Sequence, residues 1–184
     1  MIKSSQKIID VILIKPRFFS DDRGVFSETY KKSNFDSLVS SVQFVQDNRS
    51  LSNNAYTVRG LHFQIPPYAQ AKLVSVQRGR IFDVAVDLRR NSSTFLQHVT
   101  VELTADGGEQ LFIPVGFAHG FCTLEPNTVV TYKVDQYYAP AHEAGLHWRT
   151  PKLNIEWPCG ANDGILSPKD ADLPDSVDLE SCFP

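Results

Sequence analysis

Short runs of β-branched and aromatic residues, separated by turn residues, recur along most of this chain. Such runs are typical of β-strands, and Gly79 and the Gly107–Gly108 pair are typical of the turns that join them. Strands this short bury one face each and need a second sheet to cover it. The pattern therefore predicts an all-β sandwich or barrel. The predicted strands cover residues 8–14, 25–30, 43–50, 73–77, 80–88, 98–103, 110–113, 120–124 and 128–134.

Few segments have helical character. Residues 33–40 are the best helix candidate, because Ser33 can cap a helix and Phe35, Leu38 and Val39 would share one face. Residues 18–24, rich in Asp and Ser, predict a turn.

The tail from about residue 158 is rich in Asp, Pro and Gly and predicts irregular structure that wraps the body. Apolar side chains near its start still need burial, namely Ile155, Trp157, Ile165 and Leu166.

Composition limits the class of protein. A chain of 184 residues with 42 % hydrophobic residues suits one globular domain, which we expect to span residues 1–184. The net charge is −3 without a basic stripe, which argues against nucleic-acid binding. No apolar run is long enough to span a membrane, and no signal-peptide core follows Met1, so we expect a cytoplasmic protein. Cys122, Cys159 and Cys182 form no Cys-x-x-Cys pair, which indicates a reducing compartment.

Residues 59–72 are the segment richest in candidate catalytic residues. Arg59 and His62 lie on one predicted strand, and Lys72 begins the next strand after a proline turn. An anion binder, a base and a cation for a developing oxyanion would thus lie close together. Arg59 and His62 are three residues apart, so a regular strand would face them oppositely. A bulge at Gly60 would bring both to one side.

The run Pro114 to Phe121, with its Pro-x-Gly-x-x-His pattern, resembles a signature of the cupin jelly roll. In metal-binding cupins that histidine joins a His-x-His pair, but here the earlier segment offers only His62. A metal site needs three or more ligands, so we expect no metal. Taken alone, His119 is best interpreted as a histidine at a strand end that is bonded to the backbone. If it lies beside His62, it can also line a pocket.

Several other polar residues allow two interpretations each. Asp170 can orient the His62 imidazole, although capping a helix or turn is the commoner role for an isolated Asp. Tyr132 and Tyr138 can donate protons or stack on a base, or can reflect the strand propensity of Tyr. Solvent exposure is the default for single polar residues that flank strands, here Arg23, Glu28, Gln46, Asp47, Asn48 and Arg59.

An ordered set of blocks between about Ile8 and Pro174 resembles the dTDP-4-dehydrorhamnose 3,5-epimerase family. The blocks lie at residues 19–29, 46–50, 59–64, 70–74, 81–89, 113–121, 132–133, 137–140, 143, 157–158 and 166–170. The resemblance implies a cupin-type jelly roll with a few short helices, a homodimer and no cofactor. It also implies epimerisation of a dTDP-4-keto-6-deoxy sugar at C3 and C5.

The same resemblance implies roles for single residues. His62 would be the base and Asp170 its carboxylate partner, Lys72 would stabilise the enolate oxygen, and Tyr132 would return the proton on the opposite face. Tyr138 would stack on thymine. The full set of expected substrate-binding residues is Arg23, Glu28, Gln46, Asp47, Asn48, Arg59, His119, Tyr138, Glu143 and Lys169.

Three other classes of function remain open from the sequence. A relative that inverts only one carbon, or a sugar ketoisomerase, would keep His62 and the nucleotide contacts, and Tyr132 favours double epimerisation over these. A metal-dependent cupin oxygenase would need the missing His-x-His pair. A non-catalytic sugar-nucleotide-binding module would have no need for His62, Lys72, Tyr132 and Asp170 together.

Overall fold

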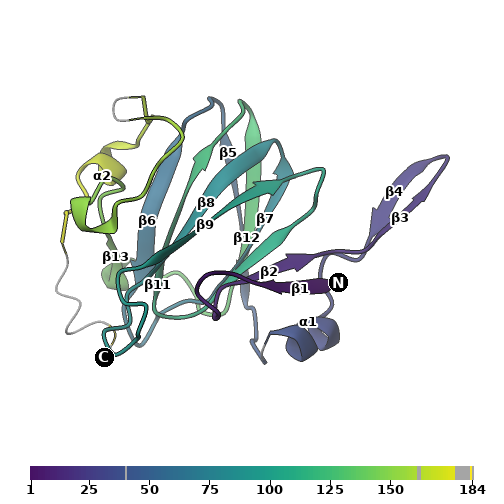
Figure 1. The fold of residues 1–184 in the computed structure, drawn as a ribbon, viewed down its shortest axis with the longest axis horizontal. Coiled ribbons are helices and arrows are strands. Elements are labelled where there is room, and N and C mark those ends of the chain that lie inside the picture. Colours follow the sequence, from purple (N-terminus) through teal and green to yellow (C-terminus); the bar gives the residue numbers. More distant parts are fainter. Residues whose placement is uncertain (40, 161–162, 177–182, 184) are drawn as a thin grey trace.

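The computed structural model describes residues 1–39, 41–160, 163–176 and 183; Cys182 lies outside the described residues. Two antiparallel sheets face each other and form the body (Figure 1). The six-stranded sheet has the order β1-β2-β10-β7-β12-β5, and the five-stranded sheet has the order β13-β6-β11-β8-β9. The predicted all-β sandwich is confirmed.

The strands of the six-stranded sheet are β1 (Ile2–Ser5), β2 (Ile12–Lys15), β10 (Gln110–Ile113), β7 (Lys72–Arg78), β12 (Thr128–Val134) and β5 (Gln46–Ser52). Those of the five-stranded sheet are β13 (Glu143–Gly145), β6 (Val58–Gln64), β11 (Phe117–Thr123), β8 (Arg80–Asp87) and β9 (His98–Thr104). The helices are short: α1 (Lys32–Leu38), α2 (Pro168–Ala171), η1 (Pro140–His142) and η2 (Pro151–Leu153).

Strand alternation places one apolar core between the two sheets. Val74 and Val130 from the six-stranded sheet pack in one cluster with Ile81 and Phe121 from the five-stranded sheet. A second cluster, which includes Phe63, Trp148 and Trp157, buries apolar residues of the C-terminal segment. A third lies under α1, where Phe35 packs with Ile14 and Phe112. Most inward-facing positions are therefore apolar, and the exceptions are candidates for function.

The C-terminal segment packs on the body largely as predicted. Trp157 is 9 % exposed and its indole Nε1 donates to the carbonyl oxygen of Trp148 at 2.8 Å. Ile165 is the exception, because it stays 45 % exposed and pairs only its backbone with Tyr56 and Val58. The prediction that its side chain needs burial is wrong.

A hairpin made of β3 (Phe18–Asp21) and β4 (Gly24–Ser27) projects away from the body (Figure 1). The sequence predicted a turn over 18–24, whereas only Asp22 and Arg23 form the turn. The hairpin leaves large apolar side chains in solvent: Phe19 is 50 % and Phe26 is 69 % exposed. Exposed aromatic residues on an isolated two-stranded ribbon indicate a surface that another molecule covers.

Other differences from the sequence prediction are local. The strand predicted at 8–14 begins only at Ile12, because Val11 N donates to the carbonyl oxygen of Ile8 in a turn. Helix α1 has Lys31, not Ser33, at its N-cap, and no side chain caps it. Strand β1 was not predicted, since Lys3 and the serines around it lack strand propensity.

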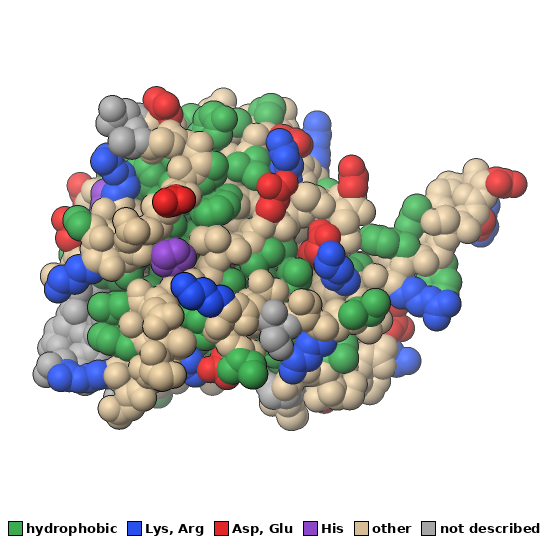
Figure 2. Space-filling view, viewed as in Figure 1, with side chains coloured by type: hydrophobic (Ala, Val, Ile, Leu, Met, Phe, Trp, Pro, Cys, Tyr) green, Lys and Arg blue, Asp and Glu red, His purple; other side chains and the backbone are tan. Residues whose placement is uncertain are grey.

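Charges are mixed on the face shown in Figure 2, with basic and acidic side chains interspersed. Among the described residues, no helix is long and apolar enough to cross a membrane.

Candidate active site

A polar pocket of about 170 Å³ opens between the two sheets. Both sheets contribute to it, so residues far apart in the chain meet there. Its lining consists of Ser50, Arg59, His62, Lys72, His119, Phe121, Tyr132 and Asp170. The structure thus brings together the four predicted catalytic residues and two of the predicted substrate-binding residues, Arg59 and His119.

A bulge at Gly60 turns Arg59 and His62 to the same pocket, as the sequence predicted. The pairing of β11 with β6 shifts register between His119 and Phe121, opposite this glycine. Gly60 has φ +113°, and a Cβ there would lie 2.6 Å from both Gly120 Cα and the carbonyl oxygen of His119. Only glycine tolerates this conformation and this close approach of two strands.

His62 and Asp170 form a hydrogen-bonded pair. Nε2 of His62 lies 2.5 Å from Oδ1 of Asp170. Burial raises the pKa of Asp170, but the hydrogen bonds from His62 and Ser167 outweigh it and hold that pKa below its usual range. The carboxylate is therefore ionised and accepts from Nε2–H, which leaves Nδ1 of His62 with a free lone pair.

Helix α2 fixes Asp170 in this position. Ser167 is its N-cap: its Oγ accepts from the backbone N of Asp170 at 3.1 Å and donates to Oδ2 of the same residue at 2.8 Å. Asp170 is 4 % exposed. The sequence left open whether Asp170 caps a helix or orients His62. In the structure Ser167 is the cap, and the Asp170 carboxylate faces the imidazole.

Lys72 is a buried cation at the start of β7. The residue is 8 % exposed, and its Nζ donates to the carbonyl oxygen of His62 at 3.4 Å. Burial lowers the pKa of Lys72 to about 8, although the carboxylates of Asp83 and Glu143 oppose the shift. The side chain therefore remains an ammonium at neutral pH.

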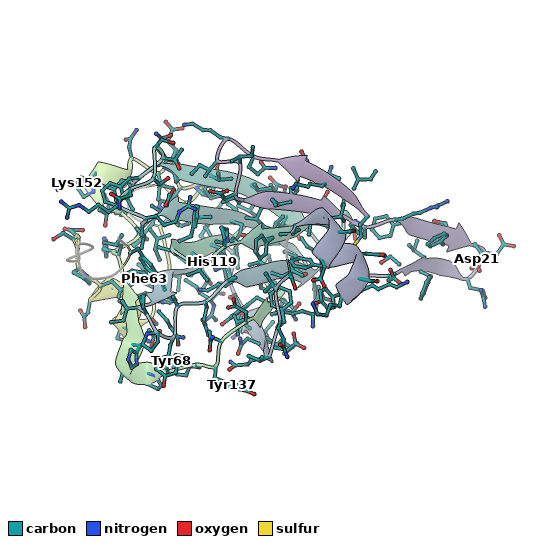
Figure 3. The ribbon with its side chains drawn as sticks, turned by 90° about the horizontal axis from the view of Figure 1, so that it is seen from below. Asp21, Phe63, Tyr68, His119, Tyr137 and Lys152 are labelled. Carbon is teal, nitrogen blue, oxygen red and sulfur yellow. The ribbon has the colours of Figure 1, made fainter. Side chains whose placement is uncertain are left out.

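His119 lies within strand β11, among the strands of the body (Figure 3), and not at a strand end. Within the described ranges its ring forms no hydrogen bond to a backbone group; its Nε2 lies 2.7 Å from Oδ1 of Asp83, and both residues are buried. Burial lowers the pKa of His119, with Asp83 opposing. A neutral ring that donates Nε2–H to Asp83 keeps Nδ1 as an acceptor.

Tyr132 reaches the pocket from the sheet opposite His62. It lies on β12 in the six-stranded sheet, whereas His62 lies on β6 in the five-stranded sheet. Burial raises the pKa of Tyr132, and nearby Arg59 partly opposes this. The phenol is thus protonated at neutral pH and can donate a proton.

A second group of predicted residues forms a network around Glu143. Its Oε2 accepts from Tyr138 Oη at 2.6 Å and from Lys169 Nζ at 2.6 Å. Gln46 extends this network, since its Oε1 accepts from the Tyr138 backbone N at 3.1 Å and its Nε2 donates to Asn48 Oδ1 at 2.8 Å. Tyr138 is 52 % exposed, which leaves its ring accessible for stacking.

The side chains of three predicted substrate-binding residues lie elsewhere. Asp47 alternates with Gln46 and Asn48 on β5, so it points to the other face of the sheet and pairs with Lys133 at 2.8 Å. Arg23 lies in the hairpin turn next to Asp21, which Figure 3 shows at the far end of the molecule from His119. Glu28 accepts from Asn34 at 2.9 Å.

Two pocket residues were missed by the sequence reasoning. Ser50 lines the pocket, and its buried Oγ has no hydrogen-bond partner in the described part of the chain. The same two-residue alternation that groups Gln46 with Asn48 predicts it. Phe121 is likewise two residues beyond His119 on β11.

Among the described residues, no group of three or more His, Cys, Asp or Glu could hold a metal ion. The pocket histidines each pair with one carboxylate, and the two pairs do not form one ligand set. The expectation of a reaction without metal stays a prediction.

Comparison with known proteins places this arrangement in context. The family model described as dTDP-4-dehydrorhamnose 3,5-epimerase matches residues 5–178. A dTDP-4-dehydrorhamnose 3,5-epimerase of Sinorhizobium fredii (strain NBRC 101917 / NGR234) is 47 % identical over 183 residues, which cover 100 % of this chain and 93 % of the relative.

Solved structures show the same fold. A dTDP-4-dehydrorhamnose 3,5-epimerase of Bacillus anthracis with TDP and pyrophosphate bound has a TM-score of 0.91 and 49 % identity, covering 94 % of this chain and 98 % of that chain. A dTDP-6-deoxy-D-glucose-3,5-epimerase of Legionella pneumophila in complex with dTDP-4-keto-L-rhamnose has a TM-score of 0.92 and 39 % identity, covering 99 % of this chain and 97 % of that chain. The predicted cupin-type jelly roll is thereby confirmed.

Proposed function

Because this chain belongs to the dTDP-4-dehydrorhamnose 3,5-epimerase family, we propose that it converts dTDP-4-dehydro-6-deoxy-D-glucose to dTDP-4-dehydro-L-rhamnose. The reaction inverts C3 and C5, the two carbons that flank the C4 ketone. The chain is thus an isomerase. The observation that carries the proposal is the meeting of His62, Lys72 and Tyr132 in one pocket between two sheets.

His62 is the proposed base. Nδ1 carries the free lone pair, because Asp170 holds Nε2 and fixes the tautomer. The Asp170 carboxylate also stabilises the imidazolium that forms when Nδ1 takes the proton from C3 or C5. Proton transfer by a positioned base and acid contributes about two to four powers of ten in rate.

Lys72 is the proposed stabiliser of the enolate oxygen. Removing a proton next to a ketone moves negative charge onto the C4 oxygen, and imidazole is too weak a base to do this unaided. A buried ammonium counters that charge in a low-dielectric site, where a single such donor is worth about 3 kcal/mol. The 8 % exposure of Lys72 supports this role.

Tyr132 is the proposed acid. Inversion requires that the proton return to the face of the sugar opposite the one that lost it. His62 and Tyr132 belong to opposite sheets and line the same pocket, so a ring between them would present one face to each. No hydride or electron needs to leave the substrate, so the proposed chemistry requires no cofactor.

The nucleotide half of the substrate is assigned to the pocket edge. Arg59 is held by Ser52 Oγ at 3.1 Å and has a guanidinium that suits a diphosphate. Gln46, Asn48 and the exposed ring of Tyr138 would hold the nucleoside and stack on thymine. TDP in the Bacillus anthracis structure supports a dTDP-linked substrate.

We assign the hairpin of β3 and β4 to an interface with a second copy of the chain. Arg23 and Glu28 do not reach the pocket of their own chain, whereas the hairpin that carries Arg23 leaves Phe19 and Phe26 exposed. We propose that the protein is a homodimer in which the hairpin covers the partner's pocket and completes its nucleotide site. We also propose that residues 1–184 form a single domain.

A relative that inverts one carbon, or a ketoisomerase, would use the same base and cation. The half-buried Tyr132 opposite His62 favours two inversions over these alternatives. A binding module is disfavoured because nucleotide contacts do not require His62, Lys72 and Tyr132 to meet in one pocket.

Proton NMR in deuterium oxide tests the proposal. Incubation of the protein with dTDP-4-dehydro-6-deoxy-D-glucose should place deuterium at both C3 and C5 and yield the L-rhamno product. Label at one position only would exclude the double reaction, and absence of label with intact TDP binding would leave a binding module.

A further inference from the structure

Asp83 is the least exposed carboxylate near the pocket, and its second oxygen has no partner. It lies on β8, 0 % exposed, between apolar neighbours that pack in the core. Oδ1 is bonded to Nε2 of His119 at 2.7 Å, whereas buried Oδ2 has no hydrogen-bond partner among the described residues. Its burial leaves this oxygen without compensation from solvent.

A buried anion of this kind is stable only beside a compensating positive charge. His119 does not supply it, because its burial keeps the ring neutral. Lys72 is a buried cation, 8 % exposed, that lines the same pocket as His119, and no carboxylate forms a close ion pair with it in the described chain. The negative charge of Asp83 favours the ammonium form of Lys72 without a direct bond between the two.

We propose that Asp83 is a positioning residue for the epimerisation: its bond to Nε2 holds His119 in the pocket wall with Nδ1 as the acceptor, and its buried negative charge supports the ammonium of Lys72 in the same pocket. The inference rests on the proposed function and adds a residue that does not touch the sugar. Asp83 acts only through Lys72 and His119.

The other groups around Lys72 leave Asp83 as the main source of this effect. Glu143 of β13 also favours the charged lysine, but it is engaged by Lys169 and Tyr138. Asp170 of α2 is engaged by His62. The remaining pocket groups are neutral or cationic: Tyr132 of β12, His119 of β11, and Arg59 and His62 of β6.

Burial alone pulls the lysine toward the neutral amine, and its pKa of about 8 already reflects the opposing effect of Asp83. Loss of the carboxylate should therefore lower the pKa of Lys72 further. The amine cannot neutralise an enolate, so activity would fall at a lower pH than in the wild type.

Asp83→Asn tests this directly. The amide has the same shape and its oxygen still accepts from His119, but the charge is gone. We expect the alkaline limb of kcat/KM, which reports the free enzyme, to move down by about one pH unit or more. Asp83→Glu should keep the limb near its wild-type position even if its rate is lower. Glu102→Gln, an exposed acid of the same sheet, is the matched control.

Lys72→Arg identifies the group that titrates. A guanidinium stays charged, so the limb near pH 8 should disappear in Lys72→Arg and should not return in the double variant with Asp83→Asn.

The outcomes test the role of Asp83 separately from the proposed epimerase function. A uniform loss of rate in Asp83→Asn, with the limb unmoved, would make Asp83 merely structural and overturn the inference. Failure of both Asp83→Asn and Asp83→Ser to fold would do the same. Wild-type protein without turnover would overturn the proposed function itself, and the inference with it.

Discussion

Nε2 of His62 and Oδ1 of Asp170 lie 2.5 Å apart although 108 residues separate them in the chain. The contact joins a strand of the body to a one-turn helix in the C-terminal segment, and the Ser167 cap fixes the helix side. In the proposed mechanism, proton removal therefore depends on how this segment packs on the body, as well as on the sheets.

His62→Ala should remove the base. Proton transfer contributes about two to four powers of ten, so we expect a loss of that size in kcat with unchanged affinity for TDP. The product assay by NMR and TDP binding by calorimetry check the two parts. His98→Ala on β9, away from the pocket, is the control. Inversion by His62→Ala at the wild-type rate would contradict the assignment of the base.

Tyr132→Phe should separate exchange from inversion. Without the phenol, His62 can still remove a proton and return it to the same face, so deuterium should enter the sugar while little L-rhamno product forms. Proton NMR in deuterium oxide measures both. Tyr56→Phe, a partly exposed tyrosine outside the pocket, is the control. Full inversion by the variant would assign the acid to another group.

Lys72→Met should cost about 3 kcal/mol of transition-state stabilisation, or about 10²-fold in kcat. The wild-type rate should also depend on this lysine through pH. The ammonium is the active form and its fraction falls as pH rises through its pKa, so kcat/KM should decline above a pH of about 8. A rate that stays level well past this pH would show that the charged lysine is not required.

Gly60→Ala should destabilise the fold. The new Cβ would meet Gly120 and the carbonyl oxygen of His119 at 2.6 Å, at φ +113°. Strain and overpacking together predict a loss of about 3 kcal/mol or more in the free energy of unfolding. Urea denaturation measures it against Gly160→Ala, where φ is +62° and no atom lies within 4 Å, so only about 1–2 kcal/mol should be lost. Equal losses at both sites would argue against close approach of the strands.

Phe19→Ser combined with Phe26→Ser should weaken dimerisation. Each exposed ring offers apolar area worth about 2 kcal/mol when buried against a partner. Sedimentation velocity should show a shift toward monomer at concentrations where the wild type is dimeric. Val115→Ser, a partly exposed residue of the body, is the control. A variant as dimeric as the wild type would place the interface away from the hairpin.

The sequence predicts the strands best where apolar runs are bounded by turns. The predicted range 128–134 coincides with β12, and 110–113 coincides with β10. The prediction from sequence is wrong where pairing with another strand determines the local structure. Strand β3 contains Ser20 and Asp21, which favour turns, but pairing with β4 makes this segment a strand.

The candidate site also contains residues that the sequence could predict and residues that it could not. His62, Lys72, Tyr132 and Asp170 could be selected because their chemistry and the family resemblance agree. Asp83 could not, because a single acid in an apolar strand has many possible partners and only the fold pairs it with His119. Arg23 stays a prediction, since its own chain leaves it outside the pocket.

The bulge at Gly60 has one more consequence. It places Arg59, the proposed phosphate ligand, and His62, the proposed base, on a single strand whose backbone sets the gap between them. In the proposed function, we expect this separation to select substrates by the distance between the phosphate on the anomeric carbon and the carbon that loses its proton. Substrates with a longer tether at this point would carry their ketone past the imidazole, whatever nucleoside they bear.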